Sequence, residues 1–485
     1  MRKLFQKKTL KELSAFSIWY IIVFFVILRL PSLIEPVWYA DEGIYEVIAN
    51  AMHNGRVLYS QVWDNKPPLL YILYFLTGNL FGIKLLSILF GIGEVYFFYK
   101  ITKLLFNRQK SILISTILFT ILLGSPFIEG NIANAENFMI LPILVSFYIL
   151  LRKNSLQIND GIWAGIFFFI ALLLKFVAVF DLIVWVIWAS IHEAWGKGVH
   201  TSLRFKKSVI YMVGVLTLLG VVTAGVLLLF GILGDFYNAV FVGTISYISE
   251  KNTAGLSNSL LIIKIILLFT LTWAIFLYRK KLSKETMFIL LWTNFSLFNV
   301  FFSQRLFLHY LLLLAAPFSL LVGSVIDSLG KKRLILSLIT VICTILIWLS
   351  FTFYHRTFEY YGNYFQFVFM NKNIDSYQRF FDKDTPRNYE IARIISSTMK
   401  DKNILVWSDG GEIYALLGGS PFGKYVVAYH MLFYKSAYDE TKALFEKSKP
   451  DVIVEVTEIP KEMGLLDDYQ ESFHMEGIRV YERQF

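Results

Sequence analysis

Acidic and basic side chains that stand beside long apolar stretches are the residues of this sequence best suited to chemistry. Ionisable groups at membrane depth are energetically unfavourable, and they usually line a cavity or a functional site. Carboxylates can take a proton from a reacting group, and cationic side chains can hold an anion. The candidates fall in four separate parts of the chain: Asp41, Glu42, Glu46, Asp64 and Lys66; Glu129 and Glu136; Lys175 and Asp181; Arg305 and His309.

The elements that would position these residues are membrane-spanning helices. Of the 485 residues, 56% are hydrophobic and only 17% are charged, whereas an average soluble domain has about 25% charged residues. This composition excludes a disordered chain, a coiled coil and a nucleic-acid-binding domain. The apolar runs predict about 11 spans, at 15–34, 83–104, 111–123, 136–151, 161–175, 177–191, 208–232, 259–278, 285–303, 307–326 and 333–352.

The basic residues predict how these spans are oriented. With the N-terminus inside, the inner segments hold 22 lysines and arginines, and the outer loops hold only Arg56, Lys66, Lys251 and Arg305. This asymmetry follows the positive-inside rule. We therefore expect a multi-pass plasma-membrane protein with a cytoplasmic N-terminus and with the candidate residues gathered at the outer face. The apolar segment 67–81 would be a helix of only about 22 Å, so we expect it to lie beside the membrane or to re-enter it on the outer side.

The last 133 residues have a different character. Residues 353–485 carry a net charge of −4, whereas residues 1–352 carry +14. We expect a polytopic α-helical membrane domain (1–352) followed by a C-terminal extracytoplasmic α/β domain (353–485) with a mostly parallel sheet. The predicted strands are Asn403–Trp407, Lys424–Tyr429 and Asp451–Val456, and a helix is predicted around Ala437–Lys447.

The outer loop 35–82 holds the clearest local pattern. Asp41 stands where a helix N-cap is expected, and an apolar stripe then recurs at helical spacing until Gly55. The stripe predicts a short amphipathic helix on the membrane surface. Its members are Tyr45, Ile48, Ala49 and Met52.

This loop resembles the first outer loop of the GT-C membrane glycosyltransferases, and most closely the branch of protein O-mannosyltransferases and lipid A aminoarabinose transferase. The resemblance rests on the order Asp41-Glu42, Tyr45, Ala49, Met52, Gly55, Tyr59 and Asp64-Asn-Lys66-Pro-Pro-Leu-Leu-Tyr71. Similar pieces follow in order at Asn134-Ala-Glu136-Asn, Ala171-Leu-Leu-Leu-Lys175, Arg305-Leu-Phe-Leu-His309-Tyr310 and Val406-Trp407. Lys84 departs from the arginine that many relatives have there.

The resemblance implies an inverting hexosyl- or pentosyltransferase. It would move a sugar from a polyprenyl-phosphate-linked donor to a protein, lipid or glycan acceptor at the outer face, in contact with membrane lipids. It implies Asp41 and Glu42 as the catalytic residues, with Asp41 as general base, and Glu42 and Glu136 as positioning groups. The implied ligands of the donor phosphate are Lys66, Lys175, Arg305 and His309, and Tyr45, Tyr59 and Tyr310 are candidates for contacting the sugar or the prenyl chain. No cofactor is expected to be required, although Mg²⁺ or Mn²⁺ at Asp41 and Glu42 is left open.

Two other functions stay open at this point. The same charges could line the path of a lipid-linked-sugar transporter or flippase, or the chain could be a non-catalytic scaffold. A transporter often has repeated halves and charges through the membrane depth. The sequence shows no repeat and places its charges toward one face, which favours the enzyme.

Overall fold

The computed structural model describes residues 18–152, 156–193, 199–244, 257–303, 306–399, 402–433 and 435–484. The chain forms two compact units, each assembled from segments that are distant in sequence. Unit 1 comprises Met1–Leu30, Ser87–Val226 and Ile245–Thr357. Unit 2 comprises Pro31–Leu86, Leu227–Thr244 and Phe358–Phe485.

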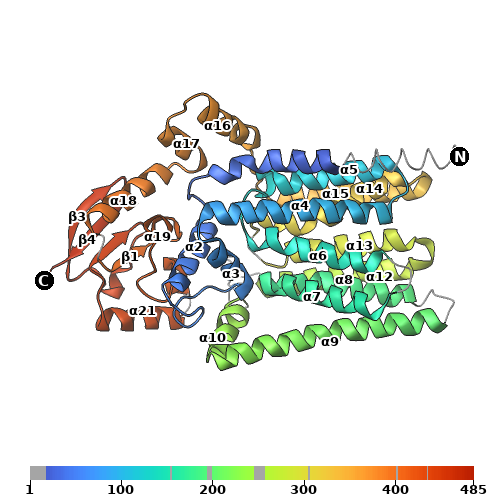
Figure 1. The fold of residues 1–485 in the computed structure, drawn as a ribbon, viewed down its shortest axis with the longest axis horizontal. Coiled ribbons are helices and arrows are strands. Elements are labelled where there is room, and N and C mark those ends of the chain that lie inside the picture. The colour runs from blue at the N-terminus through green and yellow to red at the C-terminus, as the bar shows by residue number, and fades with distance from the viewer. Residues whose placement is uncertain are drawn as a thin grey trace. The chain divides into compact units, whose positions relative to one another are not determined.

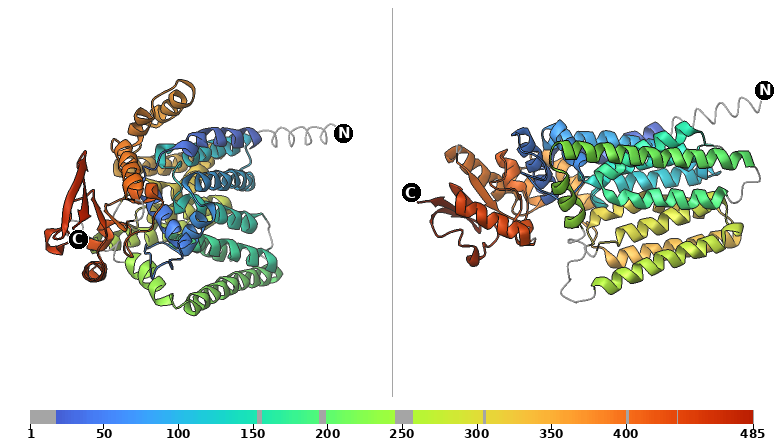
Figure 2. Two further views of the ribbon diagram at one scale, coloured as in Figure 1. Left: turned by 60° about the vertical axis from the view of Figure 1, so that its left-hand side comes forward. Right: turned by 90° about the horizontal axis from the view of Figure 1, so that it is seen from below.

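Unit 1 is a helical bundle whose helices lie side by side with similar axis directions (Figures 1 and 2). Within it, α6 packs against α7, α13 packs against α8 and α14, and α14 packs against α5. Each predicted span coincides with a helix, the first of which is described from Ile18 onward. The helices are α4 (Leu80–Leu105, which begins in unit 2), α5 (Gln109–Gly124), α6 (Ala135–Leu151), α7 (Ile158–Leu174), α8 (Val179–Glu193), α9 (Val199–Leu229), α12 (Ser257–Leu277), α13 (Lys284–Val300), α14 (Leu312–Asp327) and α15 (Gly330–Ser350).

In the part of the chain that the structure describes, five helices are long and apolar enough to cross a membrane. In three of them, Lys207–Leu229, Leu260–Leu277 and Gly330–Ser350, only 11%, 6% and 11% of the most apolar window is buried inside the protein. Such exposed apolar surface is unfavourable in water and is typical of contact with lipid. The remaining apolar helices are shorter, between 10 and 17 residues, so the number of 11 spans stays a prediction.

The segment 67–81 is shorter as a helix than expected. Helix α3 covers Pro68–Thr77 and ends at Gly78, whose φ of 73° is in the left-handed region that glycine adopts without strain. Helix α4 then begins at Leu80. At 10 residues, α3 is about 15 Å long, too short to cross a hydrocarbon core.

Unit 2 combines the first loop with the C-terminal part of the chain. Helix α2 (Ala40–His53) packs on α3 on one side and on α19 (Glu412–Leu417) on the other. Gly43 and Gly411 form the second contact, because a Cβ on Gly43 would lie 2.8 Å from the Gly411 carbonyl carbon. Helix α2 is therefore buried on two sides, and the expected one-sided surface helix is wrong in this respect.

The other helices of unit 2 precede or surround a small sheet. They are α10 (Leu233–Tyr237), α16 (Thr357–Phe369), α17 (Ile374–Phe381), α18 (Thr385–Thr398), α20 (Ala428–Phe433) and α21 (Lys435–Lys447). The last of these confirms the helix expected around Ala437–Lys447.

The sheet of unit 2 differs from the predicted one. Strands β1 (Ile404–Trp407) and β2 (Val452–Glu455) are parallel, as expected, but β4 (Ile478–Arg483) pairs antiparallel with β2 and with β3 (Tyr469–Met475), in the order β1-β2-β4-β3. The mostly parallel sheet is therefore wrong. A tight turn at Glu476 and Gly477, with φ of 43° and 87°, joins β3 to β4.

The predicted strand Lys424–Tyr429 is also wrong. Only Tyr425 makes a β-bridge there, with Trp63 of the first loop, and α20 begins at Ala428. The apolar run is buried because it packs against Trp63 of the first loop. From the sequence alone, this kind of burial cannot be distinguished from that of a strand.

Candidate active site

Helix α2 carries Asp41 and Glu42 in its first turn. Its N-cap is Tyr39, without a side-chain hydrogen bond, so the prediction of Asp41 as the cap is wrong. Asp41 and Glu42 instead lie in the helical first turn, where a negative charge interacts favourably with the helix dipole. Because neighbouring positions on a helix point in different directions, the two carboxylates have different partners.

Asp41 and Lys66 meet at one buried tyrosine. The Tyr45 hydroxyl donates a hydrogen bond to Asp41 Oδ2 at 3.1 Å. The Lys66 ammonium lies 4.8 Å from the centre of the same ring, within the range of a cation–π interaction. Tyr45 is 1% exposed and contacts the rings of Tyr71 and Tyr74. A rigid aromatic side chain therefore sets the position of a half-buried carboxylate and of a cation.

The backbone around Lys66 is held by a second set of contacts. Tyr59 donates a hydrogen bond from its hydroxyl to the Lys66 carbonyl at 2.8 Å, and its ring contacts Phe236. Asp64 accepts a hydrogen bond from the Tyr71 hydroxyl at 2.8 Å and lies 3.7 Å from the Lys66 ammonium. Tyr59 thus supports the loop through its hydroxyl.

The electrostatics of this loop keep Asp64 ionised. Burial alone would raise the pKa of Asp64, but the positive charge of Lys66 and a backbone hydrogen bond from Asn65 outweigh it, so the pKa lies below its usual value. His430 behaves in the opposite way, since burial lowers the pKa of His430 to about 4. Its ring packs edge-on against Trp63, so a neutral imidazole lies behind the loop at neutral pH.

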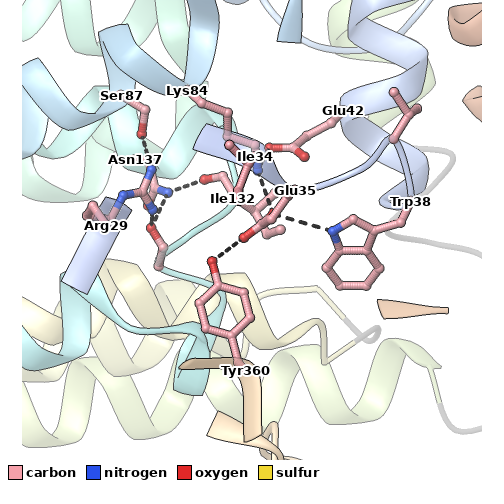
Figure 3. A network of polar contacts seen from close by, with 12 residues as sticks. Arg29, Ile34, Glu35, Trp38, Glu42, Lys84, Ser87, Ile132, Asn137 and Tyr360 are labelled. Atoms are coloured by element: carbon pink, nitrogen blue, oxygen red, sulfur yellow. Dashed lines mark hydrogen bonds and ion pairs between the residues drawn. The ribbon is translucent and has the colours of Figure 1, made fainter. Parts of the chain in front are cut away.

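Glu42 belongs to a buried ionic group that involves Lys84. The Lys84 ammonium lies 2.7 Å from Glu42 and 3.0 Å from Glu35, and its side chain is 1% exposed. Glu35 also accepts hydrogen bonds from the hydroxyl of Tyr360 and from the indole of Trp38. Figure 3 shows Lys84 between the two carboxylates and Tyr360 directed toward Glu35. We call Glu35, Glu42 and Lys84 the Lys84 triad; it fixes the start of α2 relative to α4.

Two further glutamates of unit 2 have perturbed pKa values. Burial, then the like charges of Asp382 and Asp41, raise the pKa of Glu412 to about 7. Burial and the charge of Glu42 raise the pKa of Glu46 to about 7. The loop between β1 and α19 contains Asp409-Gly-Gly, and Glu412 is the first residue of α19. The proximity of Glu412 to Asp41 has no signal in the sequence.

A second cluster lies entirely in unit 1. Glu136 of α6 forms an ion pair with Lys175, which directly follows α7. His309 Nδ1 lies 3.0 Å from Glu129 Oε2, and His309 Nε2 lies 3.8 Å from Glu136. The Lys175 ammonium is also 4.7 Å from the centre of the Tyr310 ring. These five residues come from three distant parts of the sequence, and the fold of this unit brings them together.

Two of the remaining polar residues, Asp181 and Arg29, have separate surroundings, and Arg305 lies outside the described residues. Asp181 accepts a hydrogen bond from the indole of Trp292 at 2.7 Å, inside the bundle. Arg29 donates to the Gly130 carbonyl and to the Ser87 hydroxyl at 2.9 Å, and thereby links three segments of unit 1 (Figure 3).

Sequence reasoning missed Glu35 and gave Asp64 no specific role. Glu35 directly follows the 3₁₀ turn Leu30–Ile34 at the end of the first apolar helix, just before Pro36. A lone carboxylate in that context is a signal for a buried partner. Among the described residues, no group of three or more metal-ligating side chains is arranged to hold a metal ion.

No protein-family model and no curated protein sequence matches the chain. Its fold, however, is found in solved structures. ArnT from Cupriavidus metallidurans bound to undecaprenyl phosphate superposes with a TM-score of 0.58 at 13% sequence identity, over 95% of this chain and 97% of that chain. The same protein in the apo state gives the same score over 97% and 98%. The apo Archaeoglobus fulgidus oligosaccharyltransferase gives 0.50 at 12% identity, over 91% of this chain and 69% of that one. The chain therefore has the fold of the GT-C glycosyltransferases, as the resemblance of its motifs predicted.

Proposed function

We propose that the chain is a membrane glycosyltransferase that moves a sugar from a polyprenyl-phosphate-linked donor to an acceptor at the outer membrane face. The observation that carries the proposal is that Asp41 and Lys66 both contact Tyr45, Asp41 at the hydroxyl and Lys66 at the ring, within a fold shared with two transferases. One of these structures holds undecaprenyl phosphate, which supports a polyprenyl phosphate as the carrier here.

In this mechanism Asp41 takes the proton of the acceptor as the acceptor attacks the anomeric carbon. The bond from that carbon to the phosphate oxygen breaks, and the configuration inverts. The hydrogen bond from the Tyr45 hydroxyl to Asp41 Oδ2 holds the carboxylate of the base in place. Lys66 stabilises the negative charge that remains on the departing polyprenyl phosphate.

The Lys84 triad gives Glu42 a positioning role in this proposal. The carboxylate of Glu42 faces the buried Lys84 ammonium at 2.7 Å and orients the helix turn that carries Asp41. Lys175 and His309 remain candidates for contacting phosphate, with Glu136 and Glu129 holding their side chains in place. Arg305 remains a candidate on the resemblance alone.

The decisive experiment measures the release of polyprenyl phosphate from a polyprenyl-phosphate-linked sugar by the purified chain in lipid nanodiscs, with an extract of the cell envelope as acceptor source. Asp41→Asn keeps the size and the hydrogen bond from Tyr45 but removes the base, so the rate should fall by about 10²–10⁴-fold. Asp439→Asn, on the exposed side of α21, is the matched control and should leave the rate unchanged.

Full activity in Asp41→Asn would overturn the assignment of the base. Movement of the intact donor across a sealed membrane, without release of polyprenyl phosphate, would favour the flippase instead. A parallel assay with a chelator tests the metal: activity that survives the removal of divalent ions fits our expectation that Lys66 supplies the charge, and activity restored only by Mg²⁺ or Mn²⁺ contradicts it.

A further inference from the structure

A cavity in unit 2 lies where the first loop meets α21. Its volume is about 450 Å³, which is within the range of small-molecule binding sites. We call it the Arg56 pocket. It is lined by Arg56, Gln61, Phe422, Gly423, Lys424, Tyr425, Glu440, Thr441 and Leu444.

The lining offers every kind of hydrogen-bonding group. Arg56 and Lys424 can only donate, Glu440 can only accept, and Gln61 and Thr441 can do both. Every hydroxyl of a sugar is itself a donor and an acceptor, so this mixture fits a polyol. An inorganic phosphate or another compact anion fits less well, because the Glu440 carboxylate would repel it.

The apolar part of the lining has a complementary use. Phe422 and Leu444 are both half-buried, and they present carbon surface beside the polar groups. A pyranose ring has one face of C–H groups and a rim of hydroxyls, so it can bury the first against these side chains while its rim bonds to Glu440 and Gln61. A peptide or an acyl chain would leave most of these polar groups without a partner, which is unfavourable in a pocket.

The pocket is tied to the loop that carries Lys66. Arg56 Nη1 donates to the Gly423 carbonyl at 2.9 Å, and the Trp63 amide donates to the Lys424 carbonyl at 2.9 Å. The rings of Trp63 and Tyr425 are 5.5 Å apart between centres. The wall of the pocket is therefore continuous with the segment that ends at Lys66, three residues after Trp63.

We propose that the Arg56 pocket binds an uncharged glycosyl unit of the acceptor. The assignment to the acceptor rests on the proposed function, whereas the binding of a sugar rests only on the pocket. Occupancy of the pocket would hold the first loop through the contacts of Arg56 and Trp63.

The first experiment uses the full chain in nanodiscs and needs no turnover. Saturation-transfer NMR with methyl glycosides of mannose, glucose, galactose, xylose and N-acetylglucosamine should show binding of at least one of them. The Tyr425 hydroxyl donates a hydrogen bond to Glu440 Oε2 at 3.0 Å. Glu440→Gln removes a charged acceptor but can still accept this hydrogen bond, so the Kd of that glycoside should rise about tenfold. Leu444→Trp fills the cavity and should abolish the signal, and Glu446→Gln, an exposed glutamate of the same helix, should have no effect.

The outcomes separate the pocket from the proposed function. Equal signals in wild type and in Leu444→Trp, or the absence of any glycoside signal, would overturn the site, as would binding of inorganic phosphate in place of the glycosides. In the release assay, Leu444→Trp should raise the KM for the acceptor and leave the KM for the donor unchanged; a raised donor KM would contradict the assignment to the acceptor. Loss of turnover in Asp41→Asn with glycoside binding retained would support both proposals. Glycoside binding by a wild-type chain without any turnover would support the sugar site and contradict the proposed function.

Discussion

Removal of the charge of Lys84 from the Lys84 triad should lower the stability of the protein strongly. Lys84 is 1% exposed, and its ammonium faces two carboxylates at 2.7 and 3.0 Å. Lys84→Met keeps the length of the side chain and removes the charge, so two buried carboxylates lose their common cation. Breaking a buried ion pair by removing one partner lowers the free energy of unfolding by about 3–5 kcal/mol.

The expected magnitude can also be obtained from proton uptake. A buried carboxylate without a cation can avoid the unfavourable charge by binding a proton, which costs about 3.7 kcal/mol at pH 7 and about 1 kcal/mol at pH 5 for an ordinary glutamate. The folded variant then binds more protons than the unfolded chain, so its stability falls as the pH rises. The penalty of Lys84→Met should therefore shrink by about 2.7 kcal/mol for each protonated carboxylate between pH 7 and pH 5.

The assay is unfolding by SDS titration in mixed micelles, followed by tryptophan fluorescence, at pH 5 and at pH 7. Lys84→Arg should be nearly as stable as wild type because it keeps the charge, and Lys442→Met, at an exposed site, controls for the loss of a lysine. A penalty below about 1 kcal/mol at pH 7, or one that does not shrink at pH 5, would refute the buried triad.

Two further predictions concern the contact between α2 and α19. Gly411→Ala would place a Cβ 2.4 Å from the backbone of Gly43 and Ile44, so the free energy of unfolding in SDS should be about 1–3 kcal/mol lower than in wild type. Gly419→Ala, whose Cβ would have no neighbour within 4 Å, is the control and should be neutral. Equal stability of the two variants would contradict the close packing. The raised pKa of Glu412, about 7, means that its contribution to stability is present below the ordinary glutamate pKa and is lost as the pH rises through 7. Glu412→Gln should therefore flatten the fall in stability between pH 5 and pH 8, and parallel curves for the variant and wild type would count against it.

The sequence predicted the helices well because their signal is local. Apolar runs of sufficient length mark each helix of unit 1, and the stripe from Tyr45 to Met52 marks α2. The sheet was predicted less well because its pairing depends on distant residues. Val452–Glu455 is buried at every position and Ile404–Trp407 at its last three. The hairpin of β3 and β4 alternates only weakly between buried and exposed positions, and Lys424–Tyr429 is apolar because it packs against the first loop.

The candidate site divides in the same way. The residue types around Asp41 and Lys66 could be recognised from their order in the first loop, and charge placement grouped Glu136, Lys175 and His309. The partners of Glu42 could not be predicted, because Lys84 reaches it from a different helix and Tyr360 reaches Glu35 from 325 residues away. A sequence motif shows which residues are present, whereas the partner that each residue contacts depends on how the chain packs.

The bonds between the first loop and the C-terminal segment also affect how the protein is made. Arg56 and Gly423 are 367 positions apart, and Val37 and Tyr389, which are joined by a hydrogen bond, are 352 apart. At a synthesis rate of about 5–20 residues per second, the second partner leaves the ribosome roughly 20–70 s after the first. The loop that carries Asp41 and Lys66 therefore emerges early but completes its fold only when nearly the whole chain has been translated. A nascent or prematurely terminated chain contains the motif without the scaffold that positions it.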